Sequence, residues 1–247
     1  MSLIEIVGRN FINQQSPDIA LSIIIPVYNK FNFTRNCLED LFQLGPNHEI
    51  IVVDDCSSDE TSAELKKLNR VNFKVIRNET NSGFAKSCDA GFQASRGTNV
   101  MFLNNDIRVQ SNHSNWTDII LKEMTEDVLM GPTGGLLNVG NQFAFLYETN
   151  NPQKPINFMS GWCISATRKT FDKLVIDNSK PFCEDFFAYY EDADLSFRGT
   201  QLGIKFKMID IPVIHFGKIT SSQLNTGKLY SESRQTFIKK WQGKWNY

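Results

Sequence analysis

The stretch LSIIIPVY, residues Leu21–Tyr28, is a short apolar run that ends at a turn. Runs of this length and composition are typical of strands that are buried on both faces of a parallel sheet. Residues 33–44 follow with apolar side chains at helical spacing, and Gly45-Pro46 ends the predicted helix. Residues 49–53 form a second buried run. The chain therefore begins as strand, helix and strand, the unit from which parallel sheets are built.

The same alternation continues as far as residue 103. Residues 58–68 and 84–94 have helical periodicity, and residues 73–76 and 99–103 are short apolar strands. Strands that alternate with helices predict an α/β fold with a mostly parallel central sheet flanked by helices. Such sheets bind ligands at the carboxyl ends of their strands. The polar residues that follow the four strands are then expected along one edge: Tyr28-Asn29, Asp54-Asp55, Arg77-Asn78 and Asn104-Asn105-Asp106.

The second half of the chain has a less regular pattern. From the periodicity we expect a loop over 131–140, a strand over 157–166, a helix over 191–202, two short strands within 205–214 broken at Pro212, and a C-terminal helix over 228–241. There is no repeat, low-complexity segment or convincing linker in the sequence. We therefore expect a single domain from residue 21 onward, preceded by an N-terminal extension.

Length and composition exclude several classes of protein. The 247 residues suit one α/β domain, and 26 basic against 27 acidic residues argue against a broad basic face for nucleic acid. Five scattered cysteines without a C-x-x-C pair argue against a zinc site and favour a reducing compartment. No apolar run approaches the roughly 20 residues of a membrane span, and the first 20 residues lack a signal-peptide core. We expect a cytoplasmic protein, at most peripheral to the cytosolic face of a membrane.

Two polar groups after strands have both a structural and a functional interpretation. Asp54-Asp55 can be a turn and helix cap, or one carboxylate can accept a hydrogen bond from the imide N–H of a nucleobase. Asn104-Asn105-Asp106 can be an ordinary turn, or can supply oxygen ligands to a hard divalent cation that keeps positions open for phosphate.

Acidic residues alternate with aromatic ones between residues 184 and 194. They can be the acidic N-terminus of a helix, favoured by the macrodipole. Alternatively, a carboxylate in a partly apolar pocket has a raised pKa and can act as a general base beside an aromatic platform for a sugar. His215 follows a strand and precedes a loop with Gly217, so that a structural role and a metal-ligand role are both open.

Seven short blocks follow one another in a fixed order along most of the chain: SIIIPVYN (22–29), VVDDCSSDET (52–61), NSGFAKSCDAG (81–91), FLNNDI (102–107), SGWCISATR (160–168), FFAYYEDADLSFR (186–198) and IHFG (214–217). Together they resemble family 2 glycosyltransferases of the GT-A fold, especially the rhamnosyltransferase-like branch. The resemblance implies one Rossmann-like domain over 21–247, after an extension over 1–20. It also implies a nucleotide-binding half, 21–107, and an acceptor-binding half, 108–247, which contains a smaller acceptor-side subregion.

The resemblance also implies roles for single residues. The implied nucleotide and donor contacts are Pro26, Tyr28, Asn29, Asp54, Asp55, Asn81, Gly83, Lys86, Asn104, Asn105 and Asp106. The implied sugar and acceptor contacts are Gly161, Trp162, Tyr189 and Tyr190. Asp106, at the position of the family's D-x-D motif, and His215 are the implied metal ligands. Asp192, next to Glu191, takes the position of the catalytic base. Asn104 replaces the first Asp of the motif.

We therefore expect an inverting enzyme of polysaccharide biosynthesis. It would transfer a sugar from a UDP- or dTDP-linked donor to a hydroxyl of a glycan or glycoconjugate, with a divalent metal, Mn or Mg. The expected partners are this donor and acceptor and no nucleic acid, with a homodimer left open. The alternative is a catalytically inactive module that binds a nucleotide-sugar or a glycan. A Rossmann dehydrogenase is disfavoured, because no G-x-G-x-x-G follows the first strand.

Overall fold

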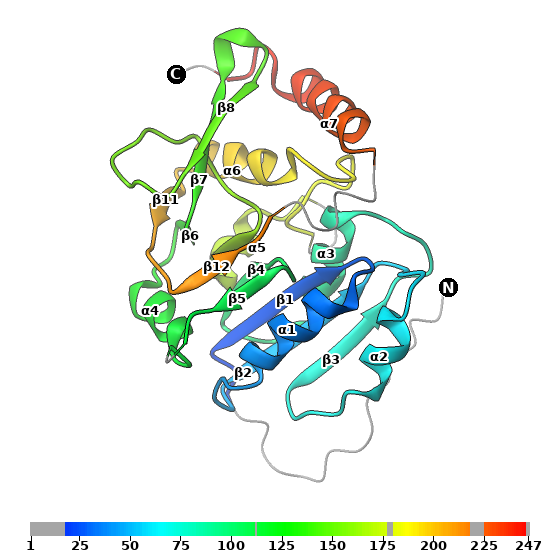
Figure 1. Ribbon diagram of the computed structural model, residues 1–247. Helices are drawn as coiled ribbons and strands as arrows, with labels where there is room; N and C mark the ends of the chain where they lie inside the picture. Colours follow the sequence, from blue (N-terminus) through cyan, green and yellow to red (C-terminus); the bar gives the residue numbers. More distant parts are fainter. Residues whose placement is uncertain (1–17, 112, 177–179, 218–224, 246–247) are drawn as a thin grey trace.

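The computed structural model describes residues 18–111, 113–176, 180–217 and 225–245. At its centre is a seven-stranded sheet in the order β11-β6-β10-β4-β1-β2-β3 (Figure 1). The strands of this sheet are β1 (Leu21–Val27), β2 (His48–Asp54), β3 (Phe73–Arg77), β4 (Asn99–Leu103), β6 (Val128–Gly131), β10 (Cys163–Thr167) and β11 (Lys205–Met208). Only β10 is antiparallel to its neighbours, so the prediction of a mostly parallel central sheet is confirmed.

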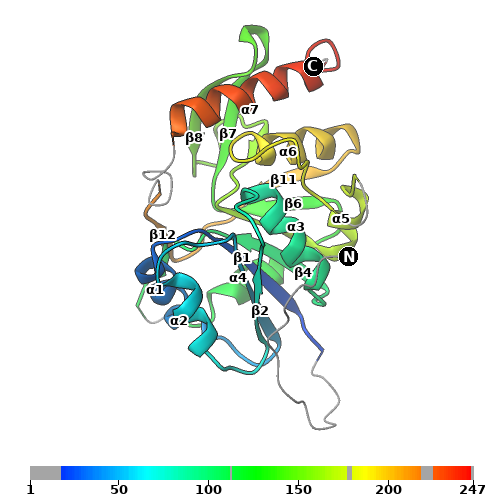
Figure 2. The ribbon, with the colours of Figure 1, turned by 90° about the vertical axis from the view of Figure 1, so that its right-hand side faces the viewer.

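Helices cover both faces of the sheet. They are α1 (Phe31–Leu41), α2 (Thr61–Lys67), α3 (Phe84–Ala94), α4 (Trp116–Glu123), α5 (Arg168–Lys173), α6 (Glu191–Gln201) and α7 (Thr226–Trp241). Figure 2 shows α1 and α2 on one side of β1 and β2, with α3 on the other. Alternate residues of β1 enter two separate apolar clusters, Ile23 and Ile25 on the α1 side and Ile24 on the α3 side. Burial on both faces explains why LSIIIPVY is apolar at almost every position.

Two smaller sheets complete the fold. The first has the order β8-β7-β9 and consists of β7 (Gly134–Asn138), β8 (Ala144–Thr149) and β9 (Phe158–Met159). It lies with α6 and α7 in the upper part of Figure 1, beyond the end of the central sheet. The second pairs β5 (Ile107–Val109) antiparallel with β12 (Val213–His215). A single turn of 3-10 helix, η1 (Val139–Asn141), follows β7.

The prediction of a loop over 131–140 is wrong, because β7 occupies half of that range, and the end of β6 and the start of η1 also extend into it. Its glycines serve close packing within a sheet: a Cβ on Gly135 would lie 2.1 Å from the Phe158 ring, and one on Gly134 would lie 2.5 Å from Ile156. A glycine in a strand often marks such a close approach. The single strand expected over 157–166 is also wrong, since β9 and β10 belong to different sheets.

Other boundaries differ less. The first helix starts at Phe31, two residues before its predicted start, and the two short strands expected within 205–214 are β11 and β12, separated by residues 209–212. Most of the expected N-terminal extension lies outside the described residues. Its last two residues contact the domain, because the carbonyls of Ile19 and Ala20 accept hydrogen bonds from Thr98 and Asn99. None of the described helices has the length and hydropathy of a membrane span.

Candidate active site

A cavity of about 810 Å³ opens where β1, β2 and β4 end. The residues that follow these strands form one wall, and β7, β9, the start of α6 and the start of α7 contribute to the opposite wall. The position agrees with the expectation that a parallel sheet binds ligands at the carboxyl ends of its strands. The volume lies within the range of cavities that bind small molecules, which is about 300–1,000 Å³.

The cavity is lined by most of the residues that the sequence implied for the donor. These are Pro26, Tyr28, Asp55, Asn81, Gly83, Asn104, Asn105 and Asp106. The implied sugar and acceptor residues Gly161, Trp162, Tyr189 and Tyr190 line it as well, as do Glu191, Asp192 and His215. Elements from both halves of the chain therefore meet at one cavity.

Three of the implied donor residues lie outside the lining. Asp54 is only 1% exposed, accepts a hydrogen bond from Ser57 N–H at 2.8 Å and pairs with the Arg77 guanidinium, so it fits the interpretation as a turn. Asn29 accepts a hydrogen bond from Ser58 N–H at 2.7 Å and thereby fixes the loop after β2.

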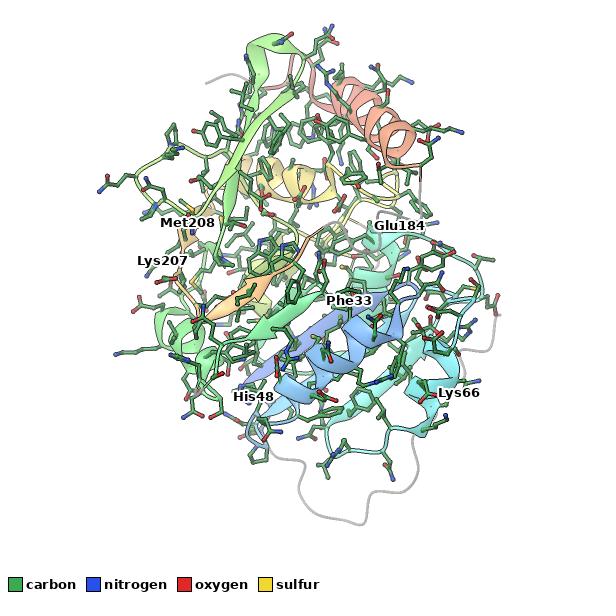
Figure 3. The ribbon with its side chains drawn as sticks, viewed as in Figure 1. Phe33, His48, Lys66, Glu184, Lys207 and Met208 are labelled. Atoms are coloured by element: carbon green, nitrogen blue, oxygen red, sulfur yellow. The ribbon has the colours of Figure 1, made fainter. Side chains whose placement is uncertain are left out.

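Lys86 is the third of these residues. It lies on α3, and its ammonium group is 3.9 Å from the carboxylate of Glu184, which Figure 3 labels beside α3. The pair is partly exposed, so that its contribution to stability is about 0–1 kcal/mol. The structure thus places Lys86 in a surface ion pair outside the cavity lining, and its contact with the donor stays a prediction.

Asp55 is a buried carboxylate held by a loop of the backbone. Its Oδ1 accepts hydrogen bonds from Asn78 Nδ2 and Ser82 N–H, both at 2.8 Å, and its Oδ2 accepts one from Gly83 N–H at 2.7 Å. Gly83 has φ of +89°, and a Cβ there would lie 2.2 Å from the carbonyl oxygen of Phe187. Only glycine fits this position without displacement of the backbone. Two carboxylate oxygens offer about four acceptor sites, so one remains for a ligand.

Asp106 and His215 face each other across the β5–β12 pair. Nε2 of His215 lies 3.1 Å from Oδ1 of Asp106, a buried oxygen without a well-aligned hydrogen bond among the described residues. The His215 ring stacks on Trp162, with centroids 4.5 Å apart and planes 9° apart. Asn104 Nδ2 lies 3.4 Å from the same His215 nitrogen, and Asn105 is tied to Thr34 of α1. A carboxylate oxygen and an imidazole nitrogen are therefore held side by side at the cavity wall.

These two groups fit a divalent cation. Carboxylate oxygen and imidazole nitrogen are both ligands of Mn²⁺, and a buried carboxylate oxygen without a well-aligned hydrogen bond is what a missing partner would leave. No cluster of three or more His, Cys, Asp or Glu side chains with metal-binding geometry occurs in the described ranges. The protein would thus supply two ligands and leave the other positions to phosphate oxygens and water.

Asp192 lies in the first turn of α6, next to Glu191. Its Oδ2 accepts a hydrogen bond from Gly161 N–H at 2.8 Å, and a Cβ on Gly161 would lie only 3.2 Å from this carboxylate. Burial raises the pKa of Asp192 to about 6, the hydrogen bonds from Gly161 and Ala193 oppose the shift, and the charge of Glu148 adds to it. A base with this pKa is ionised at neutral pH and can still take up a proton.

Glu191 has a different environment. It is 7% exposed, and its Oε2 is buried without a hydrogen-bond partner among the described residues. Burial, and next the charge of Asp192, raise the pKa of Glu191 well above its usual value. Burial is therefore the first cause of a raised pKa at both of these neighbouring carboxyl groups.

Tyr189 and Tyr190 precede α6 in the left-handed region, with φ of 70° and 66°. Residues other than glycine are held there only when the surroundings fix them, often at functional sites. The Tyr190 hydroxyl donates to Phe143 O or shares a hydrogen bond with the Tyr230 hydroxyl, both at 3.0 Å. Burial raises the pKa of Tyr190, so this hydroxyl stays protonated.

Residues 22–195 match the family model described as Glycosyl transferase family 2. The chain belongs to this family. The matched segment begins in β1 and ends within α6, so it includes Asp55, Asp106 and Asp192.

Glycosyltransferases from several bacteria are similar to this family member. An uncharacterized glycosyltransferase of Haemophilus influenzae is 42% identical over 87 residues, which are 35% of this chain and 29% of that protein. The poly(ribitol-phosphate) beta-N-acetylglucosaminyltransferase TarS of Staphylococcus aureus is 28% identical over 169 residues, 66% of this chain and 30% of TarS. The chain thus spans about 30% of the length of these two curated relatives.

Solved structures confirm the GT-A fold of this family 2 chain. TarS residues 1–349 in complex with UDP-GlcNAc superpose with a TM-score of 0.59 at 20% identity, over 92% of this chain and 68% of that one. A mannosyltransferase from Pyrobaculum calidifontis, in complex with GDP-Man and Mn2+, gives a TM-score of 0.57 at 13% identity, over 78% and 55% of the two chains.

Several cavity residues of this family 2 chain have no counterpart among the residues singled out in the sequence. They are Val27, Phe84, Ser87, Leu137, Phe145, Glu148, Phe158, Ser160, Phe187, Ala188, Ala193, Gly217, Thr226, Gly227 and Tyr230. Seven of these fifteen residues come from β7, β8, β9 and α7, which lie outside every matching block, and the other eight lie within the blocks. Tyr230 lies inside the predicted C-terminal helix, where an aromatic residue gives no signal of its own.

Proposed function

We propose that this chain is an inverting glycosyltransferase that uses a nucleotide-diphosphate sugar, a divalent cation and Asp192 as general base. The acceptor is a hydroxyl of a glycan or glycoconjugate. The observation that carries the proposal is that one cavity contains three arrangements. Asp55 is a fixed carboxylate for the nucleobase, Asp106 and His215 form a carboxylate–imidazole pair, and Asp192 is an oriented carboxylate for the acceptor proton. Membership of glycosyltransferase family 2 supports it.

Charge is the main reason to include the cation. The described lining of the cavity has five carboxyl groups, from Asp55, Asp106, Glu148, Glu191 and Asp192, and no Lys or Arg. A diphosphate would be repelled from such a wall unless a cation lies between them. Asp106 and His215 would hold that cation, and when bound it would neutralise charge on the leaving diphosphate. The Mn2+ bound by the mannosyltransferase neighbour together with GDP-Man is consistent with this role.

Asp192 would take the proton in the transfer step. The acceptor oxygen forms a bond to the anomeric carbon while the bond from that carbon to the phosphate oxygen breaks. The acceptor proton passes to Asp192, and the nucleoside diphosphate leaves. One displacement from the opposite face inverts the anomeric configuration. Gly161 N–H would keep Asp192 oriented, and general-base catalysis of this kind contributes a factor of about 10²–10⁴ in rate.

The nucleotide is proposed to carry uracil or thymine. Asp55 presents a fixed acceptor at the end of β2, which suits the imide N–H of these bases. The UDP-GlcNAc complex of TarS supports UDP, whereas the GDP-Man complex of the mannosyltransferase belongs to a more distant chain at 13% identity. The rhamnosyltransferase-like branch, polysaccharide biosynthesis, a cytoplasmic location with at most peripheral membrane contact, and a homodimer stay predictions from the sequence.

The alternative function is an inactive module that binds a nucleotide-sugar or a glycan. The arrangement at α6 favours the enzyme, because an inactive module needs no buried carboxylate pair with raised pKa values. The two functions differ in one measurable property: the module binds the donor and does not consume it.

The test is a screen of UDP-, dTDP- and GDP-sugars with and without Mn²⁺, read as release of free nucleoside diphosphate. We expect Mn²⁺-dependent release from a UDP- or dTDP-sugar. A matched variant is Asp106→Asn, which keeps the size of the side chain and removes its charge, and it should lose the Mn²⁺ dependence. Binding of every donor without release would favour the inactive module.

A further inference from the structure

Strand β8 contributes two side chains to the cavity that no motif predicted, Phe145 and Glu148. A third, Tyr230, comes from α7, beyond the residues matched by the family model. Phe145 is 47% exposed, so that its ring is available to a ligand. Figure 1 shows β8 and α7 together in the upper part of the molecule, away from the β1–β3 end of the central sheet.

A β-bulge brings Phe145 and Glu148 to the same side of β8. In the β7–β8 pair, Tyr147 lies opposite Leu136 and Phe145 lies opposite Leu137, so Leu146 is an extra residue. Side chains three positions apart in a regular strand point to opposite faces, and one inserted residue corrects the phase. Phe145 and Glu148 consequently both line the cavity, whereas Leu146 does not. Bulges that redirect side chains are common next to active sites.

Glu148 is fixed in place although it lies at the surface. Its Oε1 accepts a hydrogen bond from the Thr133 hydroxyl at 2.9 Å, and that hydroxyl accepts one from Trp162 Nε1 at 2.7 Å. The indole of Trp162 in turn stacks on His215. Ordering an exposed glutamate side chain costs conformational entropy. These contacts offset that cost before a ligand binds, so the Glu148 carboxylate is preorganised at the cavity.

Tyr230 is similarly held. Its ring contacts those of Tyr189 and Tyr190, with centroids 5.9 Å and 5.3 Å away, and its hydroxyl lies 3.0 Å from the hydroxyl of Tyr190. The start of α7 thereby adds an ordered aromatic side chain to the wall that carries Asp192.

We propose that Phe145, Glu148 and Tyr230 form the acceptor subsite and that this subsite takes an uncharged sugar; this inference rests on the proposed function. Aromatic faces pack against the C–H surface of sugar rings, and the Glu148 carboxylate accepts a hydrogen bond from a sugar hydroxyl. A phosphate or carboxylate on the acceptor would meet Glu148 and Asp192, with no Lys or Arg in the described lining to offset the repulsion.

The test compares matched acceptors with the donor found in the screen. The probes are the p-nitrophenyl glycosides of glucose and galactose, each paired with its uronic acid counterpart. We expect kcat/KM for the neutral member to exceed that for the acidic member by about tenfold or more, which corresponds to about 1.4 kcal/mol of repulsion between like charges. Glu148→Gln keeps an acceptor oxygen for Thr133 and removes the charge. The ratio of kcat/KM for the neutral glycoside to that for its uronic acid should therefore fall by about threefold or more.

Two variants of neighbouring residues separate the subsite from a general effect on β8. Phe145→Ala should raise the acceptor KM about tenfold, the loss expected from one well-packed aromatic contact. Leu146→Ala alters the adjacent side chain, which is 51% exposed and outside the lining, and should keep the wild-type KM. Equal effects of the two substitutions would contradict the subsite.

The outcomes also separate this inference from the proposed function. Donor consumption together with equal or better transfer to the uronic acids would overturn the neutral-sugar subsite and leave the enzyme intact. Consumption without transfer to any neutral glycoside would likewise overturn the subsite. If no nucleotide-sugar were consumed at all, the proposed function would fail first.

Discussion

Asp192 shows how burial and hydrogen bonding set the chemistry of a single side chain. Burial raises its pKa, whereas two backbone N–H groups, of Gly161 and Ala193, lower it, and the balance is a pKa of about 6. Burial, and next the charge of Asp192, raise the pKa of the neighbouring Glu191 well above its usual value. Burial thus raises the pKa of both adjacent carboxyl groups, and in Asp192 the N–H groups of Gly161 and Ala193 oppose this shift by stabilising the charged form.

The pH dependence of transfer follows from this pKa. A base must be ionised to act, so kcat/KM should fall about tenfold per pH unit below about pH 6. Glu148 raises the pKa of Asp192, and Glu148→Gln removes that charge. We therefore expect the acidic limb of the pH–rate profile to move to lower pH in the variant. A limb that stayed in place, or moved to higher pH, would contradict the electrostatic coupling.

Asp89, on α3, gives a stability prediction at the same scale. Burial raises its pKa to about 7, its Oδ1 accepts a hydrogen bond from Phe182 N–H at 2.9 Å, and its Oδ2 lacks a partner among the described residues. Because the folded-state pKa lies above the unfolded one, the folded state binds the extra proton and loses stability as pH rises through about 7.

Asp89→Asn removes this titration and keeps an acceptor for Phe182. We expect the difference in free energy of unfolding, Asp89→Asn minus wild type, to be roughly 2–3 kcal/mol more positive at pH 8 than at pH 5. Urea unfolding of both proteins at the two pH values measures the gain. An equal difference at both values would show that Asp89 is not the titrating group.

At the scale of elements, α6 and α7 are joined through one buried carboxylate. Asp194 is fully buried and accepts hydrogen bonds from Arg198 Nε at 3.0 Å, Lys240 Nζ at 2.8 Å and Trp241 Nε1 at 2.8 Å. A helix that carries Tyr230 is thereby fixed against the helix that carries Asp192. The position of the proposed acceptor wall depends on this contact.

Asp194→Ala leaves Arg198 and Lys240 largely buried without their partner. Removal of one member of a buried ion pair costs about 3–5 kcal/mol, so we expect a loss of this size in urea unfolding. The matched control is Lys228→Ala in the exposed Lys228–Glu232 pair of α7, which should change stability by less than about 0.5 kcal/mol. Equal losses in the two variants would argue against the α6–α7 contact as the cause.

The elements also show what the sequence could and could not predict. The strands of the first half were predictable because burial on both faces makes runs such as LSIIIPVY apolar throughout. β7 was missed because its glycines are required by the Phe158 ring, and glycine is otherwise a loop signal. Phe145 and Glu148 were missed because a bulge, which no local pattern announces, places them on one face.

For the whole molecule, the decisive property is the uneven distribution of charge. The net formal charge is −1, yet five carboxyl groups and no Lys or Arg line the described part of the cavity. Cations lie elsewhere: Lys207, labelled in Figure 3 on β11, pairs with Glu123. A nearly neutral protein thus has a locally acidic site, which favours a metal-bound donor and an uncharged acceptor.

This distribution predicts the effect of metal removal. Without a divalent cation, the affinity for UDP should fall by about tenfold or more, because the diphosphate then faces the carboxylates of the cavity directly. Calorimetric titration of UDP with Mn²⁺ and with EDTA measures the difference. Affinity that is the same under both conditions would contradict the role of Asp106 and His215.

The central claim is that Asp192 deprotonates the acceptor in this cavity. Its most direct test is release of nucleoside diphosphate by wild type and Asp192→Asn, with nucleotide binding measured on the same samples. We predict a loss of roughly 10²–10⁴ in release, with the nucleotide Kd within about threefold of wild type. Release at the wild-type rate by Asp192→Asn would contradict the account.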